Sequence, residues 1–243
     1  MTKIDSTESS GKKRTGGAKA VVAEFEPFDW QALMPAPVIG VDEVGRGCLA
    51  GPVYSAAAIV PVSEVNVLVE LGVTDSKALT STKRERLAQE ILARCHVGIG
   101  FASAEEIDRI NILQATFLSM RRALVELQKS VSGIGPGNGH ILIDGNQRIP
   151  LLGAEVELFK ALPQTTLVKG DLRALPIAAA SIVAKVTRDR LMIEAATEFP
   201  QYGFEKHKGY AAVVHRQAIA EHGPTKLHRK SFGGVREYVQ PSL

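Results

Sequence analysis

Four acidic residues stand where apolar runs of the sequence end, and they are the residues best suited to chemistry. Asp42 and Glu43 are adjacent and follow the apolar run 38–41, while Asp144 and Asp171 each follow a later apolar run. Neighbouring carboxylates in a buried site repel one another, so a positive group has to hold them. Carboxylate oxygens suit Mg²⁺ or Mn²⁺. Four carboxylates suit two such ions about 4 Å apart, which is an arrangement that hydrolyses phosphodiesters.

An arginine between two glycines follows the paired acids, as Gly45, Arg46 and Gly47. The next glycine, Gly51, comes one residue too late for the dinucleotide-binding pattern GxGxxG. Glycines let the main chain approach a ligand closely, and the guanidinium of Arg46 suits phosphate. Main-chain groups of this loop are also candidates for hydrogen bonds to a sugar 2′-hydroxyl, which distinguishes RNA from DNA.

Three further residues are candidates for substrate contacts. Lys77 and Lys169 are candidate phosphate ligands, although such lysines are commonly solvated surface residues. Tyr210, in the segment HKGY, is a candidate for stacking on a sugar or base, although a lone tyrosine in a polar stretch is more often a packing residue. We expect Asp189 to form a structural ion pair with Lys185, one helical turn back, and not to bind a metal.

The sequence pattern of the histidines and cysteines predicts neither a metal site nor a catalytic site. Cys48 and Cys95 are too few for a disulfide framework or a zinc site, and reduced thiols fit a cytoplasmic protein. Four of the six histidines lie in the stretch 205–237, where seven Lys and Arg outnumber three Glu. This basic charge favours contacts with phosphates. We expect the histidines of this stretch, including His207 and His228, to lie at the surface, and we leave them out of the site.

The hydrophobic pattern predicts the elements that must bring the four acids together. Apolar segments predict strands, the first two as a hairpin, at 38–41, 53–60, 97–101, 140–143 and 165–168. Capping boxes predict helix starts at Thr82 with Glu85 and at Ser103 with Glu106. Apolar stripes predict helices at 113–127, at 178–199 and near 211–221. The acids then lie at strand ends, where sites gather in open α/β sheets.

These elements predict an α/β fold, a mixed β-sheet flanked by helices and followed by a C-terminal helical segment. We expect residues 1–37 to be an N-terminal extension, largely disordered up to about residue 20, whose aromatic residues dock on the core. Residues 38–200 are expected to form the catalytic domain, and the basic residues 201–243 to complete a substrate groove. The start of the chain lacks the apolar core of a signal peptide, and no run approaches the ~18 apolar residues of a membrane span.

Seven segments of the sequence resemble the bacterial ribonuclease HII family, the type 2 ribonucleases H. They run in the family's order from about residue 38 to 232, as DEVGRGCLAGPV, DSKALT, ILIDGN, VKGD, ASIVAKVTRD, YGFEKHKGY and HRKSF. The resemblance implies a ribonuclease-H-like fold. It also implies an endonuclease that cuts RNA in RNA–DNA hybrids and cuts 5′ to a ribonucleotide embedded in duplex DNA. The ends left by such a cut are a 3′-hydroxyl and a 5′-phosphate.

The resemblance also implies roles for individual positions. The metal ligands that it implies are Asp42, Glu43, Asp144 and Asp171. It implies that the loop 45–47 and Tyr210 sense the ribonucleotide and its 2′-hydroxyl. The sequence departs from the family at Cys48, where proline is usual. This departure leaves the acids intact, but we expect a thiol there to change the stiffness of the loop and to be exposed to oxidation.

The sequence leaves three interpretations of the function open. The first, which we favour, is a cytoplasmic monomer that hydrolyses RNA–DNA hybrids and ribonucleotide-containing duplex DNA with two Mg²⁺ or Mn²⁺ ions, without a membrane or an obligate protein partner. The second is another metal-dependent nuclease of the same fold, such as a junction resolvase, against which the glycine loop and Tyr210 speak. The third is a nucleic-acid-binding module without catalysis, against which the four acids speak.

Overall fold

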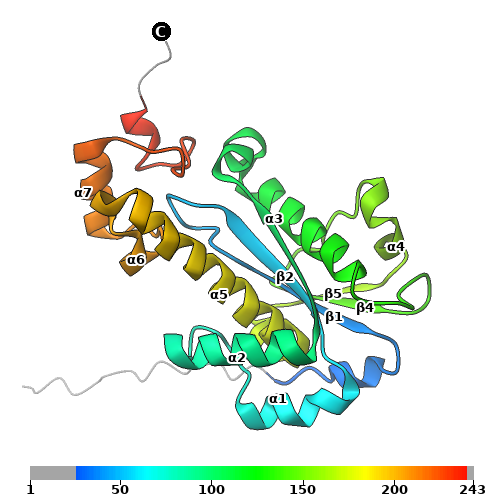
Figure 1. The fold of residues 1–243 in the computed structure, drawn as a ribbon. Coiled ribbons are helices and arrows are strands. Elements are labelled where there is room, and N and C mark those ends of the chain that lie inside the picture. Colours follow the sequence, from blue (N-terminus) through cyan, green and yellow to red (C-terminus); the bar gives the residue numbers. More distant parts are fainter. Residues whose placement is uncertain (1–25, 240–243) are drawn as a thin grey trace, which may run out of the picture.

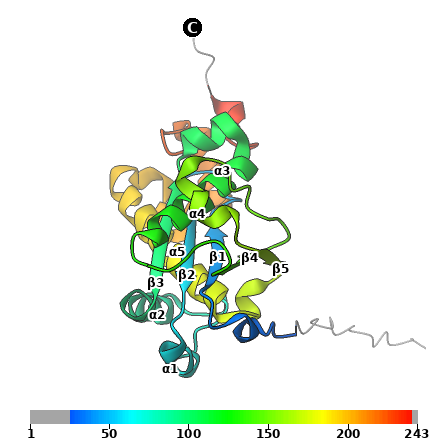
Figure 2. The same ribbon diagram turned by 90° about the vertical axis from the view of Figure 1, so that its right-hand side faces the viewer.

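The computed structural model describes residues 26–239, so the predicted disorder of the first 20 residues and the docking of Phe25 lie outside the described residues. The described chain forms a five-stranded mixed sheet in the order β3-β2-β1-β4-β5, with helices on both faces (Figures 1 and 2). The strands are β1 (Val38–Val44), β2 (Val53–Ile59), β3 (His96–Ala102), β4 (His140–Asp144) and β5 (Gln164–Leu167). The helices are α1 (Val65–Leu71), α2 (Ser81–Arg94), α3 (Ala104–Gln128), α4 (Glu157–Lys160), α5 (Leu175–Glu198), α6 (Phe204–His207) and α7 (Val213–His222). The predicted α/β class is confirmed.

The pairing of β1 decides which strand ends meet. β1 forms the predicted antiparallel hairpin with β2 and runs parallel to β4 on its other side. Val41 pairs with Ile143 in the parallel ladder, so the next residues along the two strands, Asp42 and Asp144, are neighbours. β5 continues the parallel sheet and places Leu167 beside Asp144. Three strand ends therefore lie at one edge of the sheet.

The two faces of β1 pack against different helices. Ile39 and Val41 belong to the buried cluster that α3 covers, while Gly40 faces α5. A Cβ atom on Gly40 would lie 2.1 Å from the carbonyl carbon of Pro176. Glycine is therefore required here, because the first turn of α5 rests directly on the strand. This contact fixes the distance between α5 and the end of β1 that carries the acids.

Helix α2 begins at a different cap from the one the sequence pattern predicted. The hydroxyl of Thr80, and not that of Thr82, accepts the capping hydrogen bond, which the amide of Lys83 donates. Leu79 is buried in the core directly before the cap. Because that burial fixes where the chain enters the helix, it decides between the neighbouring hydroxyl residues. The predicted capping box of Thr82 with Glu85 is therefore wrong.

Helix α3 consists of two parts that meet at Asn111. The predicted capping box of Ser103 with Glu106 is present at its start. Asn111 has a φ of 65°, and its side-chain oxygen accepts hydrogen bonds from the amides of Leu113 and Gln114. The side chain thus caps the second part, which carries the predicted apolar stripe onto the sheet.

Residues before β1 pack on the sheet, as predicted for the aromatic residues of the extension. Trp30 is buried, and Phe28 lies against the same core cluster. Phe28 also donates its main-chain amide to the carbonyl oxygen of Arg173, at 3.1 Å. Among residues 26–239, no helix combines the length and apolarity needed to cross a membrane.

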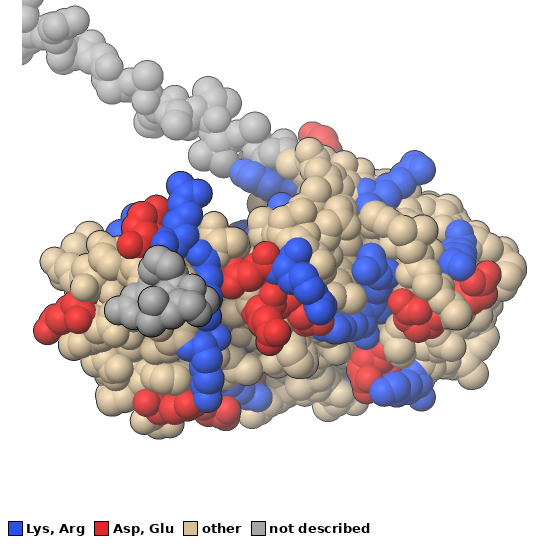
Figure 3. Space-filling model, turned by 90° about the horizontal axis from the view of Figure 1, so that it is seen from above, with Lys and Arg blue, Asp and Glu red and all other residues tan. Residues whose placement is uncertain are grey.

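The C-terminal residues form short helices packed against the end of α5 (Figure 1). A small core joins them, and it includes Tyr202, Phe204 and Ile219. His215 and His228 are also buried there, 0% and 1% exposed, so the predicted surface position of the histidines is wrong for these two. Hydrogen bonds with neighbouring groups compensate for the burial of their ring nitrogens. Seen from above, Lys and Arg side chains form a band across one part of the surface, with Asp and Glu side chains beside it (Figure 3).

Candidate active site

Side chains alternate between the two faces of the sheet along β1, so the adjacent residues Asp42 and Glu43 point to opposite faces. Asp42 follows Gly40 onto the α5 face, and Glu43 follows Val41 onto the α3 face. Asp42 is 5% exposed, and its Oδ1 accepts a hydrogen bond from the amide of Glu43 at 2.7 Å. Ser181 of α5 also donates to its carboxylate. The strand therefore presents acids toward both helical layers at its end.

Burial and mutual repulsion make the charged state of these carboxylates costly. Burial raises the pKa of Asp42 well above its usual range, and the charges of Glu43 and Asp144 raise it further. Burial also raises the pKa of Glu43, although Arg46 partly offsets the effect. The side chains of Arg46 and Glu43 form an ion pair at 3.3 Å. Without a further cation, these acids hold protons more tightly than exposed carboxyl groups do.

The other two acids complete the group. Asp144 accepts a hydrogen bond from the amide of Gly170 at 2.7 Å, which ties the end of β4 to the turn that carries Asp171. Burial raises the pKa of Asp144 above its usual value. Burial, followed by the charges of Asp144 and Asp75, raises the pKa of Asp171 to about 6. The four predicted acids are thus close enough to influence one another's charge.

Asp75 is an acidic neighbour that the sequence pattern did not place in the site. Its carboxylate accepts the amide of Lys77 at 2.8 Å and hydrogen-bonds with the carboxyl group of Asp171. It comes from the turn between α1 and α2, so no strand-end pattern marked it. Its place in the segment DSKALT, two residues before the candidate Lys77, was the available signal.

Lys77 is a cation that interacts with most of the acids. Partial burial lowers its pKa, but Asp171, Asp42, Asp75 and Asp144 together raise it above the usual lysine value. Its side chain is exposed, which leaves the ammonium accessible to a phosphate. Lys77 thus lies at the acidic group, as a phosphate ligand would.

The acids fit divalent cations by their chemistry. Across residues 26–239, no three His, Cys, Asp or Glu side chains stand in an arrangement that would hold a metal ion as they are. The group nevertheless offers only oxygen donors and carries more negative charge than Lys77 and Arg46 balance. Hard divalent cations take oxygen ligands, and their charge would relieve this repulsion. The residues present therefore fit Mg²⁺ or Mn²⁺ better than zinc.

Two buried arginines donate hydrogen bonds to the main chain of residues 45–52, which include the loop 45–47. Arg229 donates to the carbonyl oxygens of Gly45, Arg46 and Gly51 at 2.6, 2.7 and 3.0 Å. Arg188 donates to those of Ala50 and Pro52 at 3.0 and 2.9 Å. Both side chains are 0% exposed. The sequence pattern did not reveal these arginines, because nothing local distinguishes them from surface residues.

The two glycines of the loop serve different purposes. Gly45 has a φ of 92°, and a Cβ atom there would lie 2.2 Å from Nε of Arg188. It is therefore glycine so that the arginine can pack against the main chain. Gly47 faces open space, because a Cβ atom there would meet nothing within 4 Å, so its main chain is free for a ligand to approach. Arg46 between them has a side chain that is 49% exposed.

Tyr210 lies next to this loop although the two are far apart in sequence. Its neighbour Gly209 accepts a main-chain hydrogen bond from Leu49 at 2.8 Å. Tyr210 is 42% exposed, and its ring lies about 6 Å from the cations of Lys185 and Arg188. The structure therefore brings Tyr210 to the glycine loop, as required of two groups that contact one nucleotide.

Two other predicted positions have different surroundings. Lys169 is exposed in the turn after β5, with a φ of 53°, two residues before Asp171. Cys48 is 0% exposed, and its thiol donates a weak hydrogen bond to the carbonyl oxygen of Lys208, at 3.8 Å. Burial raises the pKa of this thiol. The expectation that Cys48 is exposed to oxidation is therefore wrong, because the turn before Tyr210 covers it.

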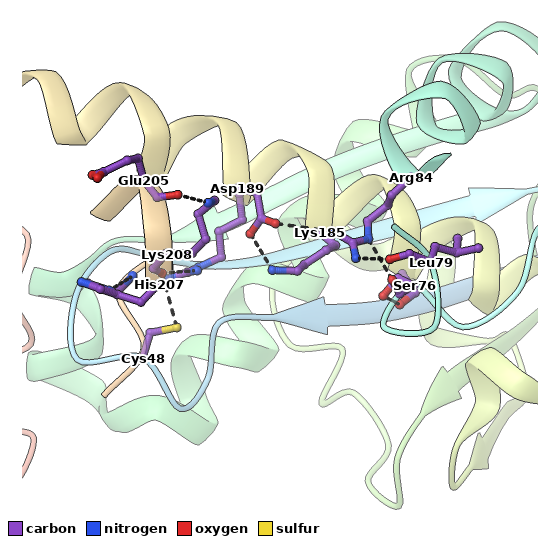
Figure 4. A network of polar contacts seen from close by, with 12 residues as sticks. Cys48, Ser76, Leu79, Arg84, Lys185, Asp189, Glu205, His207 and Lys208 are labelled. Atoms are coloured by element: carbon purple, nitrogen blue, oxygen red, sulfur yellow. Dashed lines mark hydrogen bonds and ion pairs between the residues drawn. The ribbon is translucent and has the colours of Figure 1, made fainter. Parts of the chain in front are cut away.

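Asp189 forms the predicted structural ion pair. Its carboxylate lies 2.6 Å from the ammonium of Lys185, one helical turn back, and 3.8 Å from a nitrogen of Arg84. Figure 4 shows Asp189 between these two cations. Arg84 also donates to the carbonyl oxygens of Ser76 and Leu79, so the network links α2 and the turn 75–79 to α5. The predicted ion pair of Asp189 with Lys185 is therefore confirmed.

The chain matches the family model described as Ribonuclease HII over residues 39–235. The chain belongs to the ribonuclease HII family. A ribonuclease HII from Synechococcus elongatus is 48% identical over 90% of this chain and 92% of its own length. Another from Geotalea daltonii is 50% identical over 84% of this chain and 86% of its own. As a member of this family, the protein is a ribonuclease H, a nuclease that hydrolyses RNA in RNA–DNA hybrids and depends on divalent metal ions.

Solved structures share the fold. The ribonuclease HII of Archaeoglobus fulgidus, solved in a complex with PCNA, is 28% identical with a TM-score of 0.64, over 81% of this chain and 95% of its own. The ribonuclease H2 of Pyrococcus horikoshii is 24% identical with a TM-score of 0.66, over 83% of this chain and 96% of its own. The predicted ribonuclease-H-like architecture is thus confirmed.

Proposed function

We propose that this protein cuts both the RNA strand of RNA–DNA hybrids and duplex DNA at the 5′ side of a single embedded ribonucleotide. The observation that carries the proposal is the meeting of two groups at one place. The acids Asp42, Glu43, Asp144 and Asp171 gather at the strand ends, and the loop 45–47 with Tyr210 lies at the continuation of β1. The first group is suited to hydrolysis and the second to recognising a sugar.

The four carboxylates would hold two divalent cations, Mg²⁺ or Mn²⁺. When bound, these ions activate water and stabilise negative charge on the scissile phosphate and the leaving 3′ oxygen. Asp42 and Asp144, as neighbours on β1 and β4, hold the ligand oxygens at fixed positions on rigid strands. No side-chain nucleophile is needed, and the ends produced are a 3′-hydroxyl and a 5′-phosphate.

Cationic groups beside the acids would bind the phosphates. Lys77 interacts electrostatically with the acids and would contact the scissile phosphate, while Arg46 and Lys169 would contact its neighbours along the strand. We propose that the segment 201–243 completes the substrate groove, which agrees with the excess of Lys and Arg over Glu in the stretch 205–237. Residues 38–200 would then form the catalytic domain.

The loop 45–47 and Tyr210 would read the sugar. The open main chain at Gly47 provides hydrogen-bonding groups for a 2′-hydroxyl, and the exposed ring of Tyr210 provides a surface on which the sugar can rest. DNA lacks this hydroxyl, so the loop would lose a hydrogen bond at every deoxynucleotide. This difference favours a ribonuclease over a junction resolvase of the same fold.

The decisive experiment uses a labelled duplex with one ribonucleotide, incubated with the purified protein and Mg²⁺, Mn²⁺ or EDTA. We expect one cut on the 5′ side of the ribonucleotide, no cut in EDTA, and no cut in all-DNA duplex. Asp42→Asn should abolish cutting and leave binding largely intact, whereas Tyr210→Ala should chiefly impair the single-ribonucleotide substrate. Cutting of all-DNA duplex, or near-normal turnover by Asp42→Asn, would contradict the proposal.

The same assay also tests whether cutting depends on a protein partner. We propose that the protein acts as a monomer in the cytoplasm and that cutting needs no protein partner, so the purified chain alone should be active. The archaeal relative was solved with PCNA, and adding a sliding clamp is therefore the natural comparison. If cutting required the clamp, the proposal that the protein needs no protein partner would be wrong.

A further inference from the structure

Each carbonyl oxygen of the turn Lys208–Tyr210 accepts a hydrogen bond from outside the turn. The carbonyl of Lys208 accepts from Nη1 of Arg188 at 2.8 Å and from the thiol of Cys48 (Figure 4). That of Gly209 accepts from the amide of Leu49. That of Tyr210 accepts from Nδ1 of His215 at 2.8 Å. The bonds from Cys48 and Leu49 fix the turn to the residues that follow the loop 45–47, and the bond from Arg188 fixes it to α5. The bond from His215 fixes the residue that carries the ring.

The bond to Tyr210 determines the tautomer of every imidazole in the chain that follows. A carbonyl oxygen only accepts, so Nδ1 of His215 carries the hydrogen and its Nε2 is an acceptor. Nε2 of His228 lies 3.1 Å from that atom and must donate to it. Nδ1 of His228 is then the acceptor for the amide and the hydroxyl of Thr225, each at 2.9 Å. All the hydrogen bonds point one way, from Thr225 to Tyr210.

This arrangement requires both rings to be neutral, and their surroundings keep them so. Burial lowers the pKa of His215 to about 4 and that of His228 to about 3. His207 stacks on His215 with ring centres 4.5 Å apart, and it contributes to lowering both values. A proton on either ring would set two N–H groups against each other. Near neutral pH the chain of bonds therefore has one stable pattern.

We propose that His215 and His228 are positioning residues for the recognition of the ribonucleotide. They hold the main chain of Tyr210, so that its ring stands at a fixed distance from the loop 45–47. Neither histidine contacts substrate or transfers a proton in the reaction. The inference rests on the proposed function, in which Tyr210 contacts the sugar, and it names the residues on which that contact depends.

Two substitutions at one position separate the two bonds of His215. In His215→Asn the amide nitrogen takes the place of Nδ1 and can still donate to Tyr210. In His215→Gln the amide reaches the place of Nε2, where it can meet His228, but it leaves the carbonyl of Tyr210 without that donor. His222→Gln, an exposed position on the same helix, is the control for removal of a histidine.

The readout is the ratio of kcat/KM on a duplex with one ribonucleotide to kcat/KM on a continuous RNA–DNA hybrid. We expect His215→Gln to lower this ratio about 10- to 100-fold, as misplacement of a contacting group does. His215→Asn should stay within about threefold of the wild type, and His222→Gln should match it. Circular dichroism and melting curves identify any variant that fails to fold.

A double-mutant cycle with Tyr210→Ala separates positioning from general damage to the fold. If His215 acts through Tyr210, His215→Gln should change the ratio less than about twofold once the ring is absent. An undiminished effect in that background would overturn the inference, as would an equal loss in His215→Asn and His215→Gln. If the wild-type protein does not cut the single-ribonucleotide duplex, the proposed function fails first, before any variant is compared.

Discussion

Replacing Arg229 by methionine should destabilise the fold and disturb the loop that is proposed to read the sugar. The guanidinium of Arg229 is 0% exposed and donates to the carbonyl oxygens of Gly45, Arg46 and Gly51, at 2.6, 2.7 and 3.0 Å. Burial lowers its pKa to about 10, which shows that its charge is costly to bury. Carbonyl dipoles offset that cost, so the side chain and the loop stabilise each other.

The size of the effect follows from these three bonds. A hydrogen bond to a charged group contributes about 1.5–3 kcal/mol, but bonds made by one side chain are not additive. Methionine keeps the apolar stem and leaves the three carbonyl oxygens without this donor, so we expect a loss of about 3–5 kcal/mol. Lysine keeps the charge and one or two of the bonds, so Arg229→Lys should lose about 1.5–3 kcal/mol.

Urea denaturation followed by circular dichroism measures the free energy of unfolding of each variant. In a thermal melt of a chain of this length, Arg229→Met should lower Tm by about 6–20 °C. The neighbouring Lys230→Met is the control, because the Lys230 side chain is exposed, and it should change stability by less than about 0.5 kcal/mol. A loss below about 1 kcal/mol in Arg229→Met would refute the reasoning, and so would equal losses in the methionine and lysine variants.

Three more predictions follow from the buried groups. Because burial lowers the pKa of His228 to about 3, the unfolded chain takes up a proton near pH 6.5 that the folded chain does not. Between pH 6.5 and pH 4, His228 should therefore contribute a destabilisation of up to about 1.4 kcal/mol per pH unit on acidification; in urea titrations the wild type should lose more stability over this range than His228→Gln does, and equal changes would contradict this. Gly40→Ala should cost at least about 2 kcal/mol, since its Cβ would meet Pro176 at 2.1 Å. Gly47→Ala, which meets nothing within 4 Å, should cost far less in the same titration. In scanning fluorimetry, Mg²⁺ should raise the Tm of the wild type more than that of Asp144→Asn, because the variant has lost one of the carboxylates whose repulsion the ion relieves. Equal shifts would count against the metal site.

The sequence alone determined the features that depend on local pattern. The strands follow from apolar runs, and the cap at Ser103 follows from a hydroxyl and a glutamate three residues apart. The pair of Lys185 and Asp189 follows from the i, i+4 geometry of a helix. The four acids could be named because each ends an apolar run, and because the order of the motifs is specific to one family.

Only the tertiary structure decided which polar side chains are buried and what they hold. Arg229 donates a hydrogen bond to Gly45, which is 184 positions away in the sequence. His215 looks like a surface histidine in the sequence, and only the structure shows its hydrogen bond with His228. Asp75 lies beside the acids because the turn before α2 packs against α5, where the hydroxyl groups of Ser76 and Ser181 are hydrogen-bonded. Burial of a charged or polar group depends on partners supplied by distant segments, and no local period records those partners. The candidate catalytic acids were therefore readable from the sequence, whereas the supports of the recognition loop became visible only once the chain had folded.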